Sequence, residues 1–165
     1  MKQNWVDLKS HIDWAKKAAD TRISIVSKGG VDALNEDSKL SHLKGVLGEK
    51  VYAILNNYSV RVSDTADGGD DFPDGVNVKS APIHDKYPTR WCVNKAAKKR
   101  PSKRYCFVEL DIDTCGGVRG RSVGFLTHDQ VKTCEVGDPG NRGIPCYMVR
   151  EKDIKTYHFL NLQTP

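Results

Sequence analysis

The spacing of apolar residues changes about one third of the way along this chain, and that change constrains its fold more than any other feature. Between Leu40 and Leu55 apolar residues recur at intervals of three and four, which predicts a helix over about 38–57 with one buried face. That face comprises Leu40, Leu43, Val46, Leu47, Val51, Ile54 and Leu55. Later segments alternate or form short apolar runs, which is typical of strands. The order predicts a mixed α/β domain with a central sheet flanked by helices.

The remaining elements follow from the same patterns. Apolar residues from Asn4 to Asp20 have helical spacing, and 27–37 is rich in turn formers. Gly116–Arg121 is expected to be a flexible turn, and Thr127–Lys132 a short capped helix. The expected strands are Val60–Val62, Val76–Val78, Tyr105–Ile112, Ser122–Leu126 and Pro145–Val149, the last followed by a helical turn at 151–154.

Length and composition narrow the class of protein. A chain of 165 residues fits one domain with a core of its own, and 38% hydrophobic with 28% charged residues indicates a folded protein. No run of about 18 apolar residues is present, and the first residues lack the apolar core of a signal peptide. We therefore expect no membrane partner and a cytoplasmic location, in a protein of bacterial or phage type.

Five cysteines are present, an odd number, and none forms a CxxC pair. Reduced intracellular thiols are the simplest interpretation. A zinc site that combines some of them with His84 or His128 is the alternative, although the spacings are longer than zinc sites usually show.

The net charge of +5 indicates an anionic partner. Residues 95–104 contain six cations and no acid, and they lie between apolar stretches. We expect this segment to form a surface loop placed to meet phosphates. If the anionic partner is DNA, the predicted DNA-binding residues are Lys95, Lys98, Lys99, Arg100, Lys103, Arg104, Arg119 and Arg121, with Trp91, Arg90 and Arg119 as weaker candidates for reading bases.

The segment from Asp70 to Ser80 has the clearest chemical content. On a strand, Asn77 and Lys79 project from the same face. A turn at Pro73–Gly75 would bring Asp71, or its neighbour Asp70, back beside them. A carboxylate that holds a hard cation, next to a lysine, suits phosphodiester hydrolysis, because the cation polarises the phosphoryl oxygen and the lysine positions water or balances charge.

The run Asp71-Phe-Pro-Asp-Gly-Val-Asn-Val-Lys-Ser-Ala-Pro-Ile83 resembles the PD-(D/E)xK motif of restriction-endonuclease-like nucleases, and most closely that of MutH-type DNA endonucleases. Leu43-Lys-Gly-Val-Leu-Gly-Glu-Lys-Val51 is similar to the helix that precedes the motif in that family. The likeness covers about 40–83, with a looser likeness over 105–126.

This resemblance implies a restriction-endonuclease-like fold and a metal-dependent endonuclease that cuts duplex DNA. It implies catalytic roles for Asp71, Asn77, Lys79 and Glu49. It also implies a Mg²⁺ site, with Mn²⁺ as a substitute, formed by Asp71, Asn77, Glu49 and the backbone carbonyl of Val78. At this size, a homodimer that cuts both strands is expected in preference to a nickase.

Asn77 departs from the family pattern, which has Glu or Asp at this position, and an amide brings no charge to a metal. Three explanations are open: an introduced Asp→Asn change that traps an uncleaved complex, a natural residue compensated by Asp70, Asp74 or Glu49, or a disabled nuclease that only binds. Val-Asp-Val-Lys would be an ordinary form of the motif, which favours the first.

Simpler interpretations compete with these roles. The acids at 67–74 can be a solvated turn, and Glu49 an exposed or ion-paired helix residue. Glu109, Asp111 and Asp113 alternate, and a solvated sheet face is favoured for them over a place near the metal. At the level of function, the alternatives are a catalytically silent binding module, and a junction resolvase or RNA nuclease that uses the same centre.

Overall fold

The computed structural model describes residues 5–28, 36–59, 70–83, 89–95, 102–113, 116–139, 143 and 145–156, and it places the side chains of these except 25–28 and 36–38. The strand predicted at Val60–Val62 lies outside the described residues, as do His84, Lys98, Lys99 and Arg100.

The fold combines helices with two sheets, so the prediction of a mixed α/β protein is confirmed. A four-stranded sheet has the order β1-β5-β4-β2, and a three-stranded sheet has the order β3-β7-β6. Strands β2 and β4 run parallel, whereas the other described pairs are antiparallel. In chain order the elements are β1 (Val6–Asp7), a 3-10 turn η1 (Lys9–His11), α1 (Ile12–Lys28), α2 (Glu36–Asn56), β2 (Val76–Pro82), β3 (Arg90–Asn94), β4 (Arg104–Ile112), β5 (Val118–Thr127), α3 (His128–Val131), β6 (Glu135–Gly137) and β7 (Cys146–Arg150).

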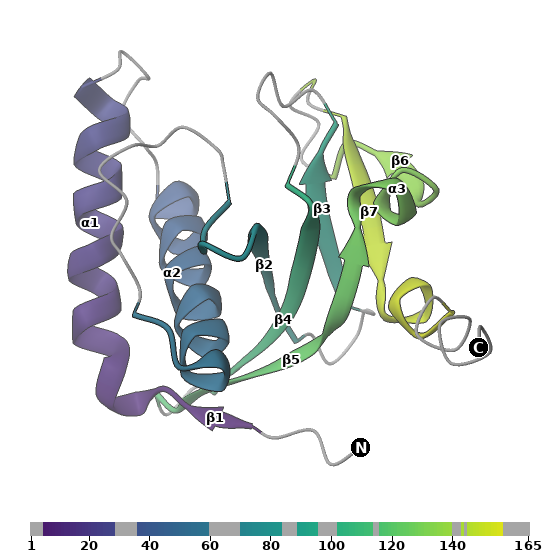
Figure 1. Ribbon diagram of the computed structural model, residues 1–165. Coiled ribbons are helices and arrows are strands. Elements are labelled where there is room, and N and C mark those ends of the chain that lie inside the picture. Colours follow the sequence, from purple (N-terminus) through teal and green to yellow (C-terminus); the bar gives the residue numbers. More distant parts are fainter. Residues whose placement is uncertain are drawn as a thin grey trace.

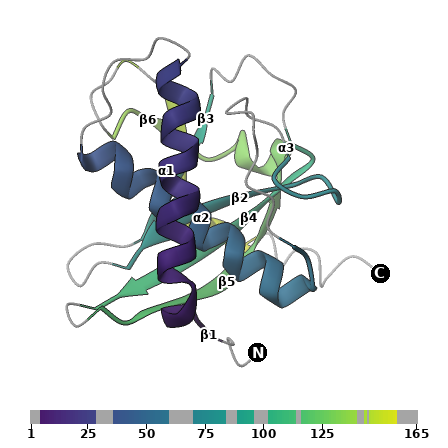
Figure 2. The same ribbon diagram turned by 90° about the vertical axis from the view of Figure 1, so that its left-hand side faces the viewer.

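Helices α1 and α2 cover one face of the four-stranded sheet, and the three-stranded sheet and α3 lie on the other side (Figure 1). Seen from the helix side, α1 crosses in front of α2, which in turn lies over the sheet (Figure 2). Strand β4 serves both sides: Val108 and Leu110 pack with the helices, while Tyr105 and Phe107 pack with the second sheet. Because both faces of β4 are covered, its sequence is a nearly continuous apolar run.

Helix α2 contacts β2 closely. A Cβ atom on Gly48 would lie 2.5 Å from the Cβ of Ser80, so only glycine permits this approach. The Ser80 hydroxyl also donates a hydrogen bond to the Lys44 carbonyl at 2.7 Å. Glu49, the next residue after Gly48, is thereby held beside the strand that carries the motif.

Two helix predictions were wrong in their details. The helix expected over 4–20 begins at Ile12, after β1 and η1, and continues to Lys28. In α2, Leu40, Ile54 and Leu55 are exposed although periodicity placed them on a buried face. The stretch of α2 from Val46 to Ala53 contributes the buried residues Val46, Leu47, Val51, Tyr52 and Ala53 to the core shared with the sheet.

The strand predictions were correct for β2, β4 and β7 but missed β1, β3 and β6. The segment predicted as a flexible turn contains the first residues of β5, which begins at Val118. Glycines in that segment misled the prediction: Gly120 lies inside β5, where a Cβ would come within 2.4 Å of Val51. The capped helix after Thr127 is confirmed, with a reciprocal capping box between Thr127 and Gln130.

Among the residues that the structure describes, no helix is both long and apolar enough to cross a bilayer.

Candidate metal centre

The chain doubles back just before β2, as the turn residues predicted. The Asp71 amide donates to the Val76 carbonyl at 2.9 Å, and the Gly75 amide donates to the Phe72 carbonyl at 3.1 Å. Gly75 adopts φ +78°, a conformation that glycine adopts without strain. The turn therefore places Asp71 alongside β2 rather than in line with it.

Asp71 lies at the free edge of β2. In the four-stranded sheet β2 has β4 as its neighbour on one side only, and the Val78 amide donates to Asp71 Oδ2 at 2.6 Å. The N–H and C=O of one strand residue point to the same edge. The Val78 carbonyl is thus directed toward the side on which the Asp71 carboxylate lies, as a shared cation would require.

Glu49 comes to the same region from α2, where it is buried. Its two carboxylate oxygens accept hydrogen bonds from Arg22 of α1, at 2.8 Å and 2.5 Å. Sequence reasoning did not single out Arg22. Its position on the helical repeat of α1 gives no indication that it crosses to α2, and only the packing of the two helices places it there.

Lys79 completes what we call the coupled cluster: Arg22, Glu49, Asp71 and Lys79. Loss of water around the ammonium group lowers the pKa of Lys79, while Asp71 and Glu49 act to raise it. Asp71 keeps exposed surface, yet loss of water around its carboxyl group, followed by repulsion from Glu49, raises its pKa to about 7. The Val78 hydrogen bond and the charges of Lys79 and Arg22 act in the opposite direction. The four side chains thus respond to one another's charge.

Asn77 is half-buried on β2, where it pairs in register with Tyr105 of β4. It lies on the face opposite Val76 and Val78, which pack with the helices, and therefore on the same face as Lys79. The amide oxygen of Asn77 is buried. This confirms the predicted alternation along β2.

The donor set fits a hard cation in part. Carboxylates and a backbone carbonyl are ligands that Mg²⁺ accepts, and a cation would relieve the repulsion between Asp71 and Glu49. Both oxygens of Glu49, however, are engaged by Arg22. Within the described part of the chain, no three His, Cys, Asp or Glu side chains are grouped as metal ligands. The ligand set would be more complete with a carboxylate at position 77 in place of the Asn77 amide.

The two acids proposed as substitutes for that missing charge lie apart from the cluster. Asp74 accepts a hydrogen bond from the Tyr52 hydroxyl at 2.5 Å and lies 3.6 Å from Arg104. Asp70 is exposed and acts electrostatically on Tyr105. Asp74 is therefore engaged by other groups, whereas Asp70 acts on the strand partner of Asn77.

The predicted DNA-binding residues that the structure describes fall into two groups. Lys103 and Arg104 are exposed beside the start of β2, and Lys95 is exposed at the end of β3. Arg119 and Arg121 lie on β5, where each pairs with an acid of β4: Asp111 at 2.7 Å and Glu109 at 2.6 Å. Paired guanidinium groups have less charge to offer a phosphate, and Arg104 also has a partner, Asp74, at 3.6 Å. Lys103 and Lys95 therefore fit a DNA backbone better than the arginines do.

Two predictions about single residues were wrong, and a third residue, His128, has a contact that the sequence did not indicate. Trp91 is 1% exposed and donates its indole N–H to the Val108 carbonyl at 2.8 Å, so it has no access to a base edge. Glu109 is buried and ion-paired instead of lying on a solvated sheet face. His128 is half-buried and lies 3.2 Å from the Tyr105 hydroxyl through Nδ1. In each case packing of the second sheet or of β5 covers the residue.

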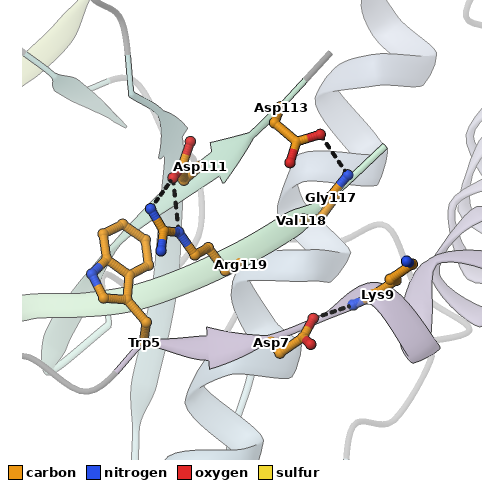
Figure 3. A pocket seen from close by; sticks show the side chains of 8 residues that line it. All are labelled: Trp5, Asp7, Lys9, Asp111, Asp113, Gly117, Val118 and Arg119. Atoms are coloured by element: carbon orange, nitrogen blue, oxygen red, sulfur yellow. Dashed lines mark hydrogen bonds and ion pairs between the residues drawn. The ribbon is translucent and has the colours of Figure 1, made fainter. Parts of the chain in front are cut away.

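A pocket of about 570 Å³ lies away from the cluster (Figure 3). Its wall includes Trp5 and the ion pair of Asp111 with Arg119, and the Arg119 guanidinium lies 4.7 Å from the centre of the Trp5 ring. Asn77 pairs with Tyr105, and Asp111 lies six positions further along β4, about 20 Å of strand away. The pocket is therefore not part of the candidate metal centre.

Comparisons with protein-family models, with curated proteins and with solved structures found no match to this chain.

Proposed function

We propose that this chain has a restriction-endonuclease-like fold and a PD-(D/E)xK-type nuclease centre that acts on duplex DNA in the presence of Mg²⁺ or Mn²⁺, and that Asn77 weakens or abolishes cleavage. The observation that carries the proposal is the convergence of Asp71, Glu49 and Lys79, from a turn, a helix and a strand, at the free edge of β2. Side chains whose pKa values are shifted by burial and by neighbouring charges cluster at functional sites.

Each residue has a role that its surroundings support. Asp71 and the Val78 carbonyl are directed to the same edge, where together they can hold a cation. A cation held there supplies Lewis-acid activation of the phosphodiester. Lys79, whose pKa is lowered, can orient the attacking water and exchange a proton with it. Lys103 and Arg104 lie at the start of β4, next to the first residue of β2, and can hold the DNA backbone there.

Glu49 is proposed to position Arg22 and to repel Asp71, and through these effects to tune the cation site. Its bidentate bond with Arg22 leaves it little freedom to bind metal directly. This assignment differs from the ligand role that the family resemblance implies for Glu49.

Plasmid cleavage tests the proposal. The chain and its Asn77→Asp variant are incubated with supercoiled DNA and Mg²⁺ or Mn²⁺. We expect cleavage by Asn77→Asp at least about a hundredfold faster than by the parent, because a carboxylate restores charge to the cation site. Asn57→Asp makes the same atom exchange at an exposed turn residue with positive φ and is the matched control. Lys79→Met in the Asn77→Asp background should remove the activity again.

A second function is favoured by Asn77 and by the engagement of Glu49 with Arg22: a catalytically silent module that binds DNA. It would be supported if neither the parent nor Asn77→Asp cuts DNA or RNA while both retain duplex tightly in a gel-shift assay. Branched DNA and RNA added to the same cleavage assay would identify a junction resolvase or an RNA nuclease. If the protein neither binds nor cuts supercoiled DNA, duplex DNA, branched DNA or RNA, both functions are contradicted.

A further inference from the structure

Three sulfur-containing side chains meet on one face of the second sheet. Cys92 of β3 pairs in register with Met148 of β7, and the Cys92 thiol lies 3.7 Å from the Met148 sulfur. Cys146 lies two residues before Met148, so both project from the same face of β7. The thiols of Cys92 and Cys146 are hydrogen-bonded to each other. The three sulfurs therefore form one contiguous group, which we call the sulfur triad.

The sulfur triad is open to solvent on one side only. Cys92 is exposed, Cys146 is half-buried and Met148 is buried. Lys79 of β2 acts electrostatically on both thiols, and Asp138 acts on Cys146. An ion could reach the triad past Cys92, and two thiolates formed there would have a neighbouring positive charge.

The composition of the triad selects the ligand. Thiolate and thioether donors prefer soft metal ions, Cu(I) above all, whereas oxygen donors are what Mg²⁺ requires. Two sulfurs bound to one tetrahedral ion at about 2.3 Å lie about 3.8 Å apart. The separation of 3.7 Å between Cys92 and Met148 matches that spacing without rearrangement. We propose that Cys92, Cys146 and Met148 form a binding site for Cu(I), separate from the oxygen-donor site at Asp71.

A disulfide between the two cysteines is the competing chemistry, and two observations disfavour it. Cys92 pairs with Met148 and Cys146 pairs with Asn94, so the cysteines are diagonal neighbours. Diagonal Cα atoms are about 7–8 Å apart in a sheet, which is beyond the usual span of a disulfide. The Cys92 thiol also lies against the Met148 sulfur directly opposite it, at 3.7 Å. Cu(I) binding instead displaces one proton from each thiol to solvent, so affinity should increase with pH.

A competition titration tests the site. The reduced full-length protein is titrated with Cu(I) under anaerobic conditions against the chromophoric chelator bicinchoninate. We expect one Cu(I) to be retained per chain. Cys92→Ser and Cys146→Ser should each weaken binding at least about a hundredfold, and Met148→Leu about tenfold, since a thioether is the weaker donor. Cys134→Ser is the matched control, because the Cys134 thiol hydrogen-bonds to the Gln130 carbonyl instead.

The outcomes separate this site from other thiol chemistry. The proposal is overturned if the parent and all variants lose Cu(I) to the chelator equally. It is also overturned if Cys134→Ser weakens binding as much as Cys92→Ser does. Peptide mapping after treatment with mild peroxide tests for a Cys92–Cys146 disulfide. If that disulfide forms and the reduced protein retains no Cu(I), the cysteine pair serves redox chemistry instead. Circular dichroism of each variant distinguishes loss of the site from loss of the fold. The titration is independent of DNA cleavage, so either proposal can fail alone.

Discussion

Two groups of interacting charges lie in different parts of the molecule and are built in different ways. On the β4–β5 ladder, Glu109 faces Arg121 and Asp111 faces Arg119, each directly opposite in register. In the coupled cluster the members come from α1, α2, the turn and β2, and the acid nearest Lys79 is repelled by another acid. The ladder pairs each acid directly with one cation, whereas in the cluster two acids repel each other although two cations lie among them. Carboxyl groups whose pKa is raised in this way are typical of functional sites.

The largest expected effect comes from removing the guanidinium of the buried pair. Arg22 and Glu49 have side chains 18% and 9% exposed. Arg22→Met should reduce the free energy of unfolding by about 3–5 kcal/mol, because it leaves a buried carboxylate unpaired. Urea denaturation measures this, and the double variant Arg22→Met/Glu49→Leu should recover much of the loss. Arg121→Met, which breaks an equally buried pair on the ladder, should cost a similar amount. A cost below about 1 kcal/mol for Arg22→Met would mean that Glu49 is solvated.

The second prediction concerns pH and separates Asp71 from the ladder acids. The pKa of Asp71 is raised from 3.8 to about 7 in the folded chain, so the native state binds more protons than the unfolded state between those values. The contribution of Asp71 to stability is therefore lost as pH rises through that window. Asp71→Asn lacks this loss, so its stability relative to the parent should increase from pH 4 to pH 7.

Thermal unfolding at a series of pH values provides the measurement. Asp111→Asn is the control, because it removes a carboxylate that is ion-paired with Arg119. An Asp71→Asn curve parallel to that of the parent would contradict the raised pKa of Asp71, to which loss of water contributes most and Glu49 next. Addition of Mg²⁺ to the Asn77→Asp variant should raise its unfolding temperature, because cation binding stabilises the folded state.

A third prediction uses the salt dependence of DNA binding. Lys103 is exposed beside the start of β2, whereas Arg119 is paired with Asp111. Lys103→Ala should reduce the slope of log affinity against log salt concentration by about 0.9, the value for one phosphate contact. Arg119→Ala should leave the slope unchanged. Fluorescence anisotropy titrations at several salt concentrations measure both slopes. The reverse result would mean that DNA binds near Arg119, beside the β4–β5 ladder.

The smallest expected effect is the stability cost of Arg119→Ala. Its side chain is 57% exposed, and solvent screens the ion pair with Asp111. We expect a loss of less than about 1 kcal/mol in urea denaturation, including any loss of its contact with the Trp5 ring. A loss as large as that of Arg22→Met would mean that the Arg119–Asp111 pair is shielded from solvent.

The sequence was informative where local rules decide the structure. Period-three and period-four spacing located α2, alternation located β2, and the Asp71–Gly75 turn followed from its proline and glycine. The same reasoning failed where tertiary contacts decide. Gly120 resembles a turn residue but lies in β5 against Val51, and the acids of β4 resemble a solvated face although β4 is covered on both sides.

The candidate site was predictable only in part, for a related reason. Asp71, Asn77 and Lys79 lie within nine residues of one another, so turn and strand geometry suffice to bring them together. Arg22 is 27 residues from Glu49 in sequence, and their contact depends on how two helices cross. The sulfur triad combines β3 with β7, and neither the missed strand β3 nor its register could be inferred from spacing.

The hydrogen bond from the Val78 amide to Asp71 has a consequence for association between molecules. A strand at the margin of a sheet exposes backbone donors and acceptors that can recruit a strand from another copy. The Asp71 carboxylate blocks one of those donors and adds negative charge in the path of an incoming strand. Replacement of Asp71 by an apolar residue should therefore promote self-association through β2, and the same side chain would keep the protein dispersed in addition to holding a cation.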